Sequence, residues 1–336
     1  MKSIFLKWTL FVPLLFLAST HSASALTIKI ATLSPGGSFW MQKMREGSDE
    51  VEKKTEGRVK FKFYPGGVMG KDRDVLRKIR MHQLQGAAIT GSSLSHIYPD
   101  IQIYNLILKF RNLDEVDFIR QKMDAGLMQG LENKGFVSLG FAEIGMAYIM
   151  SVEPVQELEH MRSRKAWVPE NNELALVALK AFSISPIPLP LRDVLMGLQT
   201  NMIDIVAGSP VAALALQWHT KVKYVTDLPL SYIFGVLVID QKVFKKISSQ
   251  DQMIVKSVMG KVIKELDNKN RQDNLLGKEA MIKQGIQFIK PTKAAADELR
   301  EKIVFANEKL EKDGNLTMET VDRMNKFLAD YRRLNP

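Results

Sequence analysis

The sequence predicts an α/β protein built from two lobes, and three observations lead to this fold class. Short runs rich in β-branched residues alternate with longer runs whose apolar residues recur at helical spacing. Such alternation is typical of a sheet covered by helices on both faces. The length of 336 residues suits two units of ordinary domain size. One very long helix, from Ser249 to about Gln284, is predicted late in the chain.

The first residues predict export. Lys2 and Lys7 precede an apolar run from Leu10 to Ala18, and small residues then end in Ala23-Ser24-Ala25. This is the three-part pattern of a secretory signal peptide, with cleavage after Ala25. The apolar run is shorter than the roughly 20 residues that a transmembrane helix needs. We therefore expect residues 1–25 to be removed.

The elements of the N-terminal half follow from periodicity and from turn residues. The helix after the first strand has Trp40, Met44 and Val51 on one face, and Gly57 stands where its end is expected. Strands are predicted at residues 27–32, 58–64, 86–90, 136–142 and 145–151, and helices at 39–55, 72–81 and 114–133.

The C-terminal half continues the same alternation. Strands are predicted at residues 164–168, 184–188, 203–207, 222–226, 233–240 and 287–289, and helices at 171–181, 191–200, 210–218, 249–284, 292–312 and 317–333. Two lobes imply a cleft between them, and in open α/β sheets ligands bind beyond the carboxyl ends of the strands. The candidate loops are 34–39, 90–93, 143–148, 167–172, 190–191 and 207–210.

Composition and motifs argue against several function classes. The absence of cysteine excludes a disulfide framework and a thiolate nucleophile. The net charge of +10 comes from basic residues interleaved with acids, so no nucleic-acid partner is expected. The sequence contains no phosphate-loop, dinucleotide or nucleophile-elbow motif, and its histidines are not at metal-ligand spacing. We expect no cofactor and no metal.

Glu143 is the acidic residue that we consider as a candidate catalytic or binding group. It ends a predicted buried strand, where desolvation would raise the pKa of its carboxyl. It could act as a base, accept a hydrogen bond from a ligand, or be a satisfied structural carboxylate. No second acid is placed to work with it, so an enzyme is not the expected class.

A series of short motifs, in order and along nearly the whole mature length, resembles the DctP-type solute-binding proteins of tripartite ATP-independent periplasmic (TRAP) transporters. The matching stretches are Ile28–Trp40, Val51–Lys60, Tyr64–Gly67 with Met69-Gly70, Val168-Pro169, Pro188–Pro190, Val194–Thr200 and Ile203-Asp204. The resemblance implies a periplasmic protein, here expected to be a monomer. It would close two lobes on a small ligand and deliver that ligand to a TRAP membrane permease.

The resemblance also implies a periplasmic-binding-protein fold with crossing strands and a long helix spanning both lobes. We expect lobe I to comprise residues 26–146 and about 234–272. Lobe II is expected to comprise about 147–233 and 273–336. A sensor subunit that presents its ligand to a membrane receptor would use the same lobes, and the sequence does not separate the two roles.

The family's usual carboxylate anchors are missing here. The resemblance implies an arginine directly before Val168-Pro169, where this chain has Trp167. A second arginine would stand near Ala147, an asparagine near residues 205–209, and an aromatic near Leu191. A guanidinium grips a carboxylate through two parallel hydrogen bonds, which an indole cannot do.

We therefore expect a cleft that binds a neutral or largely hydrophobic ligand. Trp167, Leu191 and Met146 would form its apolar wall, and Thr90, Ser92, Glu143 and Ser209 would offer hydrogen bonds. The complete expected set is Phe39, Trp40, Thr90, Ser92, Glu143, Met146, Ala147, Trp167, Leu191, Gly208, Ser209 and Tyr232. The alternative is an organic acid held by a relocated arginine, either Arg164 or Arg192. Arg164 lies three residues from Trp167 and would face the other side of the strand.

Overall fold

The computed structural model describes residues 25–170, 172–312 and 316–335. The predicted signal peptide falls on residues 1–25 and so, apart from Ala25, lies outside the described part of the chain. None of the helices among the described residues is both long enough and apolar enough to cross a membrane.

The described strands form one nine-stranded mixed sheet. Its order is β2-β1-β3-β8-β4-β7-β5-β6, and β9 pairs with β8 outside this path. The parallel pairs β1–β2, β1–β3 and β5–β6 match the predicted strand–helix–strand units. The shorter strands are β1 (Leu26–Thr32), β2 (Val59–Tyr64), β3 (Gly86–Thr90), β5 (Ala166–Pro169), β6 (Pro186–Leu189), β7 (Ile205–Gly208) and β9 (Gln287–Ile289).

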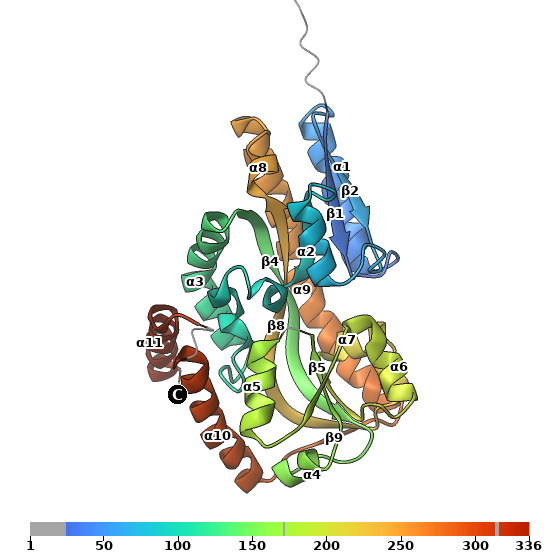
Figure 1. The fold of residues 1–336 in the computed structure, drawn as a ribbon, viewed down its shortest axis with the longest axis vertical. Coiled ribbons are helices and arrows are strands. Elements are labelled where there is room, and N and C mark those ends of the chain that lie inside the picture. Colours follow the sequence, from blue (N-terminus) through green and yellow to red (C-terminus); the bar gives the residue numbers. More distant parts are fainter. Residues whose placement is uncertain (1–24, 171, 313–315, 336) are drawn as a thin grey trace, which may run out of the picture.

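Two long antiparallel strands, β4 (Phe136–Ser151) and β8 (Tyr224–Asp240), cross the middle of the sheet and connect its halves (Figure 1). The sequence predicted each as two separate strands, which was wrong. In β4 the pairing with β8 shifts register three times, and Gly140 and Gly145 have positive φ angles of 140° and 120°. Such bulges interrupt the alternation of apolar residues without ending the strand. In β8, Pro229 lies in a segment that does not pair with β4.

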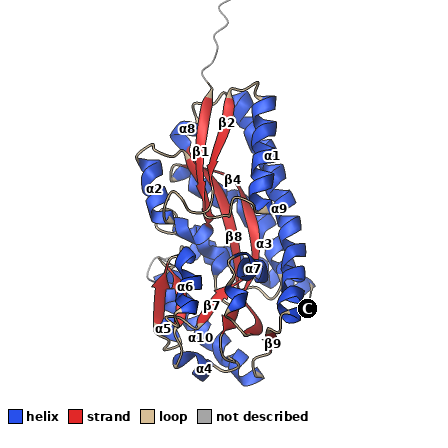
Figure 2. Ribbon diagram, turned by 90° about the vertical axis from the view of Figure 1, so that its right-hand side faces the viewer, coloured by secondary structure: helices blue, strands red, loops and turns tan. Residues whose placement is uncertain are grey.

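Helices cover both faces of the sheet (Figure 2). The long helix α9 has 35 residues, or about 52 Å at 1.5 Å per residue, and it packs on α1 of lobe I, on β4 and on α7 of lobe II. This confirms the predicted helix that spans both lobes. The helices are α1 (Phe39–Lys54), α2 (Asp72–Arg80), α3 (Leu113–Asn133), α4 (Leu158–Arg162), α5 (Glu173–Ala181), α6 (Val194–Gln199), α7 (Pro210–Ala215), α8 (Gln241–Phe244), α9 (Ser249–Lys283), α10 (Lys293–Lys312) and α11 (Met318–Leu334). Short 3₁₀ turns are η1 (Gly91–Leu94), η2 (Pro99–Asn105), η3 (Leu191–Asp193) and η4 (Trp218–Thr220).

Buried apolar side chains form four clusters, which we call core clusters 1 to 4. In lobe I, core cluster 1 includes side chains of α2, α3 and α11, and core cluster 2 includes those of α1 and α9. In lobe II, core cluster 3 includes side chains of α4, α5 and α10, and core cluster 4 includes those of α6, Trp218 and the end of α9. Each lobe therefore has a core on both faces of the sheet, as expected for two α/β lobes.

The last helix does not match the expected lobe bounds. The sequence placed residues 273–336 in lobe II, but α11 packs against α3 of lobe I. Two polar contacts fix it there, because Arg332 Nε lies 2.7 Å from Glu115 Oε1 and Thr317 Oγ1 donates to Asp100 at 2.8 Å. The other lobe bounds stay a prediction.

Candidate functional site

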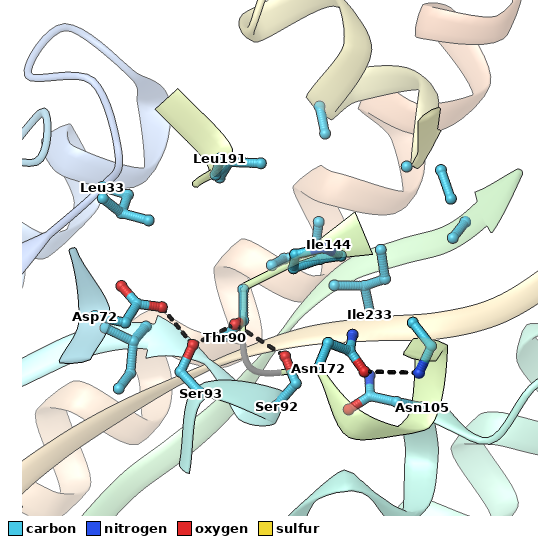
Figure 3. Close-up of a pocket in the computed structure, with 18 of the residues that line it drawn as sticks. Leu33, Asp72, Thr90, Ser92, Ser93, Asn105, Ile144, Asn172, Leu191 and Ile233 are labelled. Atoms are coloured by element: carbon cyan, nitrogen blue, oxygen red, sulfur yellow. Dashed lines mark hydrogen bonds between the residues drawn. The ribbon is translucent and has the colours of Figure 1, made fainter. Parts of the chain in front are cut away.

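A cavity of about 930 Å³ lies between the lobes, within the range of about 300–1,000 Å³ typical of small-molecule sites. The loops after β1, β3, β5 and β7 contribute to its wall, as do the crossing strands β4 and β8. Figure 3 shows Leu33 of lobe I near Leu191 of lobe II, with Ile144 and Ile233 of the crossing strands to one side of them. The carboxyl ends of the strands therefore do meet at a cleft, as predicted.

Nine of the twelve expected residues line this cavity: Phe39, Trp40, Thr90, Ser92, Glu143, Ala147, Trp167, Leu191 and Gly208. Three do not. Met146 and Tyr232 are buried in core cluster 1, since a bulge beside Gly145 changes which side chains of β4 face the cleft. Ser209 is fully buried as the N-cap of α7, where its Oγ accepts from Ala212 N at 3.3 Å.

Trp167 belongs to core cluster 4 and also lines the cavity. It is 6% exposed and meets Trp218 edge to face, with ring centroids 5.4 Å apart. Its indole Nε1 donates to Leu189 O at 2.9 Å. Because that donor is already used, Trp167 offers a ligand an apolar ring surface at the position where the family resemblance implied an arginine.

Hydroxyl groups at the start of η1 form a polar end to the cavity, which we call the hydroxyl cluster: Thr90, Ser92 and Ser93. Thr90 Oγ1 lies 3.2 Å from Ser92 Oγ and 2.8 Å from Ser93 Oγ, and Ser93 donates to Asp72 Oδ2 (Figure 3). Burial raises the pKa of Asp72, and the hydrogen bond from Ser93 opposes that rise. Hydroxyls can both donate and accept, so this cluster suits a neutral polar group.

Glu143 lines the cavity, but its carboxylate is held in an ion-pair network. Its side chain is 0% exposed, and Arg271 Nη2 of α9 lies 2.7 Å from its Oε2. Arg271 also pairs with Asp117 of α3, and Tyr232 Oη donates to Glu143 at 3.4 Å. Burial raises the pKa of Glu143, and Arg271 opposes this effect. Of the three roles considered for Glu143, the geometry favours the structural one.

Charged side chains at the rim of the cavity come from both lobes. Lys71, at the N-cap of α2, pairs across the cleft with Glu170, which follows β5, at 3.0 Å. Arg192 lines the cavity with its side chain 55% exposed, and its Nε lies 3.5 Å from Asp193. Arg164 is absent from the cavity lining among the described residues. Of the two relocated arginines considered from sequence, only Arg192 reaches the cavity wall.

Several residues of the site had no signal in the sequence. Asp72 and Ser93 come together across 21 positions, and Arg271 meets Glu143 across 128. Asn105 donates to Tyr232 O at 2.8 Å, and its Oδ1 is buried without a partner among the described residues. Asn172 could have been noticed, because an asparagine before an apolar helical run is a typical N-cap, and its Oδ1 accepts from Ala175 N.

Two lobes joined by crossing strands, with a cavity lined by both, are the architecture typical of a solute-binding protein. The family described as bacterial extracellular solute-binding protein, family 7 (DctP) matches residues 30–313. Because this match covers most of the chain, the protein belongs to the DctP family.

Solved structures and curated proteins agree with this membership. A TRAP periplasmic solute-binding protein from Xanthobacter autotrophicus Py2, with bound β-D-galacturonate, superposes with a TM-score of 0.82 at 18% identity and covers 90% of this chain and 99% of its own. The sialic acid-binding periplasmic protein SiaP of Vibrio cholerae is 21% identical over 250 residues, which are 73% of this chain and 77% of SiaP. An uncharacterised protein of Salmonella typhimurium is 23% identical over 214 residues, 62% of this chain and 65% of that protein's length. At these identities the structural likeness establishes the fold and leaves the ligand open.

Proposed function

We propose that the protein captures a neutral, largely apolar small molecule between its lobes and delivers it, as a monomer in the periplasm, to a TRAP-type membrane permease. The observation that carries the ligand class is Trp167, whose ring stands in the cavity wall with its N–H bonded to Leu189 O. A carboxylate buried there would find no guanidinium at that position.

The electrostatics of the described residues support the same ligand class. Arg120 and Arg271 lie near the crossing strands, but both are already paired with carboxylates. The lining cations Arg73, Arg80 and Arg192 are exposed, and Lys71 pairs with Glu170. A buried carboxylate without a partner costs several kcal/mol, whereas a neutral polar group needs only hydrogen bonds such as those of the hydroxyl cluster.

One observation favours a second candidate, an organic acid. Arg192 lies on the cavity wall next to Leu191, and proteins of the same fold bind β-D-galacturonate or sialic acid. In this candidate Arg192 would turn inward on closure and pair with the ligand's carboxylate.

Isothermal titration calorimetry distinguishes the two candidates. Under the proposed function, D-galacturonate and N-acetylneuraminate produce no saturable heat, a neutral apolar ligand does, and Arg192→Gln leaves that affinity within about twofold. Arg111→Gln, another exposed arginine outside the cavity lining, is the matched control. Submicromolar binding of either sugar acid that weakens at least tenfold in Arg192→Gln would overturn the neutral ligand in favour of the organic acid.

A further inference from the structure

Asn172 brings a side-chain amide to the cavity wall of lobe II. It is partly buried and lines the cavity at the N-terminus of α5. Its Oδ1 accepts a hydrogen bond from Ala175 N at 3.0 Å, which makes Asn172 the N-cap of that helix (Figure 3). A backbone N–H can only donate, so the oxygen of the amide, and not its nitrogen, must face Ala175.

This hydrogen bond leaves the amide nitrogen of Asn172 available. The oxygen and nitrogen of a planar amide lie on opposite sides of the carbon that carries them, so Nδ2 is turned away from the N–H groups of α5. Among the described residues Nδ2 has no acceptor, and it does not belong to the buried side-chain atoms that lack a partner. It is therefore accessible and can donate to a bound ligand.

The other two asparagines that line the cavity use their amide nitrogens within the protein. Nδ2 of Asn105 donates to Tyr232 O at 2.8 Å, and Nδ2 of Asn270 donates to Glu143 O. Of the asparagines in the described cavity wall, Asn172 is thus the one whose amide nitrogen is not yet hydrogen-bonded.

Helix capping alone does not require an asparagine at this position. In this chain Ser38 caps α1, Ser248 caps α9 and Thr317 caps α11, in line with the general preference for short polar residues at the N-cap. Asparagine adds to the capping oxygen an uncharged NH₂ group that can only donate. That group faces the cavity with no role in the helix.

We propose that Asn172 recognises a neutral acceptor oxygen of the ligand, such as the carbonyl of a ketone, ester or amide. This inference rests on the proposed function and narrows its ligand class. An uncharged donor replaces the water that a neutral carbonyl loses on binding, whereas a buried carboxylate needs a cation. The carbonyl would contact lobe II while the hydroxyl cluster contacts the same ligand from lobe I.

Two neutral probes test this assignment. Acetophenone carries a carbonyl, and α-methylstyrene has a CH₂ group in place of the carbonyl oxygen. NMR titrations of the chain without its signal peptide give both Kd values, and comparing their ratio in the wild type and in a variant isolates the contact between Asn172 and the carbonyl. A hydrogen bond between neutral groups changes Kd about two- to twelvefold. Asn172→Ser keeps a capping oxygen but removes the amide, and we expect it to weaken acetophenone relative to α-methylstyrene about fivefold.

A matched control separates ligand contact from helix capping. Asn112 is the N-cap of α3, accepts from Glu115 N at 3.0 Å and lies outside the cavity lining, so Asn112→Ser should leave the ratio of the two Kd values unchanged. Asn172→Asp also caps α5 but has no N–H donor, and it should repeat the loss seen in Asn172→Ser. Circular dichroism checks that each variant folds, and the two Asn172 variants provide independent tests.

The outcomes distinguish this contact from the proposed function. An unchanged ratio in both Asn172 variants, or no saturable binding of acetophenone, would overturn the role of Asn172. Benzoate, the carboxylate of the same ring, should bind the wild type more weakly than acetophenone. Tighter binding of benzoate with the effect of Asn172 retained would keep the contact and overturn the neutral ligand. An unchanged ratio with acetophenone still preferred over benzoate would leave the proposed function standing without this contact.

Discussion

At the scale of single residues, Trp167 and Glu143 show that a position at the end of a strand does not determine how the polar atoms of the side chain are used. The sequence placed both in the cleft because each ends a predicted strand, and both do line the cavity. Their polar atoms, however, are used inside the protein: the indole N–H by Leu189 O and the carboxylate by Arg271. Sequence position predicted that these two residues reach the cavity, but it could not predict whether their polar groups remain available there.

The hydrogen bond of Trp167 should be measurable in stability. Trp167→Phe leaves the Leu189 carbonyl without its donor, and we expect the free energy of unfolding to fall by about 1–3 kcal/mol. Urea denaturation followed by circular dichroism measures this. Trp218→Phe makes the same ring contraction in the facing side chain and is the matched control for lost packing. Equal losses in the two variants would show that the hydrogen bond to Leu189 contributes little.

At the scale of elements, most strands and helices were predictable and the crossing strands were not. Periodicity found β1 and α1 within a residue or two, because β1 is a β-branched run that ends at a Ser-Pro-Gly-Gly turn and α1 has one buried face. It divided β4 and β8 because register shifts and Pro229 interrupt the alternation. The same shifts explain why Met146 and Tyr232 were expected in the cleft although they face core cluster 1.

The network that joins α9 to β4 should respond to both mutation and pH. Arg271→Gln leaves Glu143 buried without its cation, and we expect a loss of about 3–5 kcal/mol at pH 8. Burial already raises the pKa of Glu143 above its usual value, and removing Arg271 removes a lowering influence. A raised folded-state pKa gives stability that is present at low pH and lost as pH rises through that pKa. The deficit should therefore shrink between pH 8 and pH 5.

Urea denaturation at both pH values measures this deficit. Arg333→Gln, which removes an exposed ion pair with Asp330, is the control and should change stability by no more than about 0.5 kcal/mol at either pH. The double variant Arg271→Gln with Glu143→Gln should recover part of the loss, because no buried charge is left on β4. A deficit that grows on acidification would contradict this description of the network.

At the scale of the whole molecule, two lobes share one sheet through β4 and β8, and α9 lies along both. We propose that the crossing strands serve as the hinge for lobe closure. The Lys71–Glu170 pair joins the lobes at the rim of the cavity. Its side chains are 38% and 36% exposed, so its contribution is that of a surface ion pair, about 0.2–1 kcal/mol.

Charge reversal tests whether this pair favours the closed arrangement. Glu170→Lys places two cations across the rim, and we expect a larger radius of gyration in small-angle X-ray scattering of the ligand-free protein at low salt. Combining it with Lys71→Glu restores opposite charges and should restore the wild-type value. Salt at 0.5 M should reduce the difference, because exposed charges are screened. An unchanged radius in Glu170→Lys would show that the pair does not influence the lobes.

The ligand class is tested most directly by native mass spectrometry of the protein purified from a bacterial periplasm without refolding. Binding proteins with an enclosed cavity retain tightly bound ligands, and the bound mass can be identified after gentle release. We predict a neutral molecule with a substantial apolar part, bound in the cavity beside Trp167. A co-purified dicarboxylate or sugar acid would contradict the proposed neutral ligand. It would indicate that the site binds a carboxylate, as sites in proteins of the same fold do.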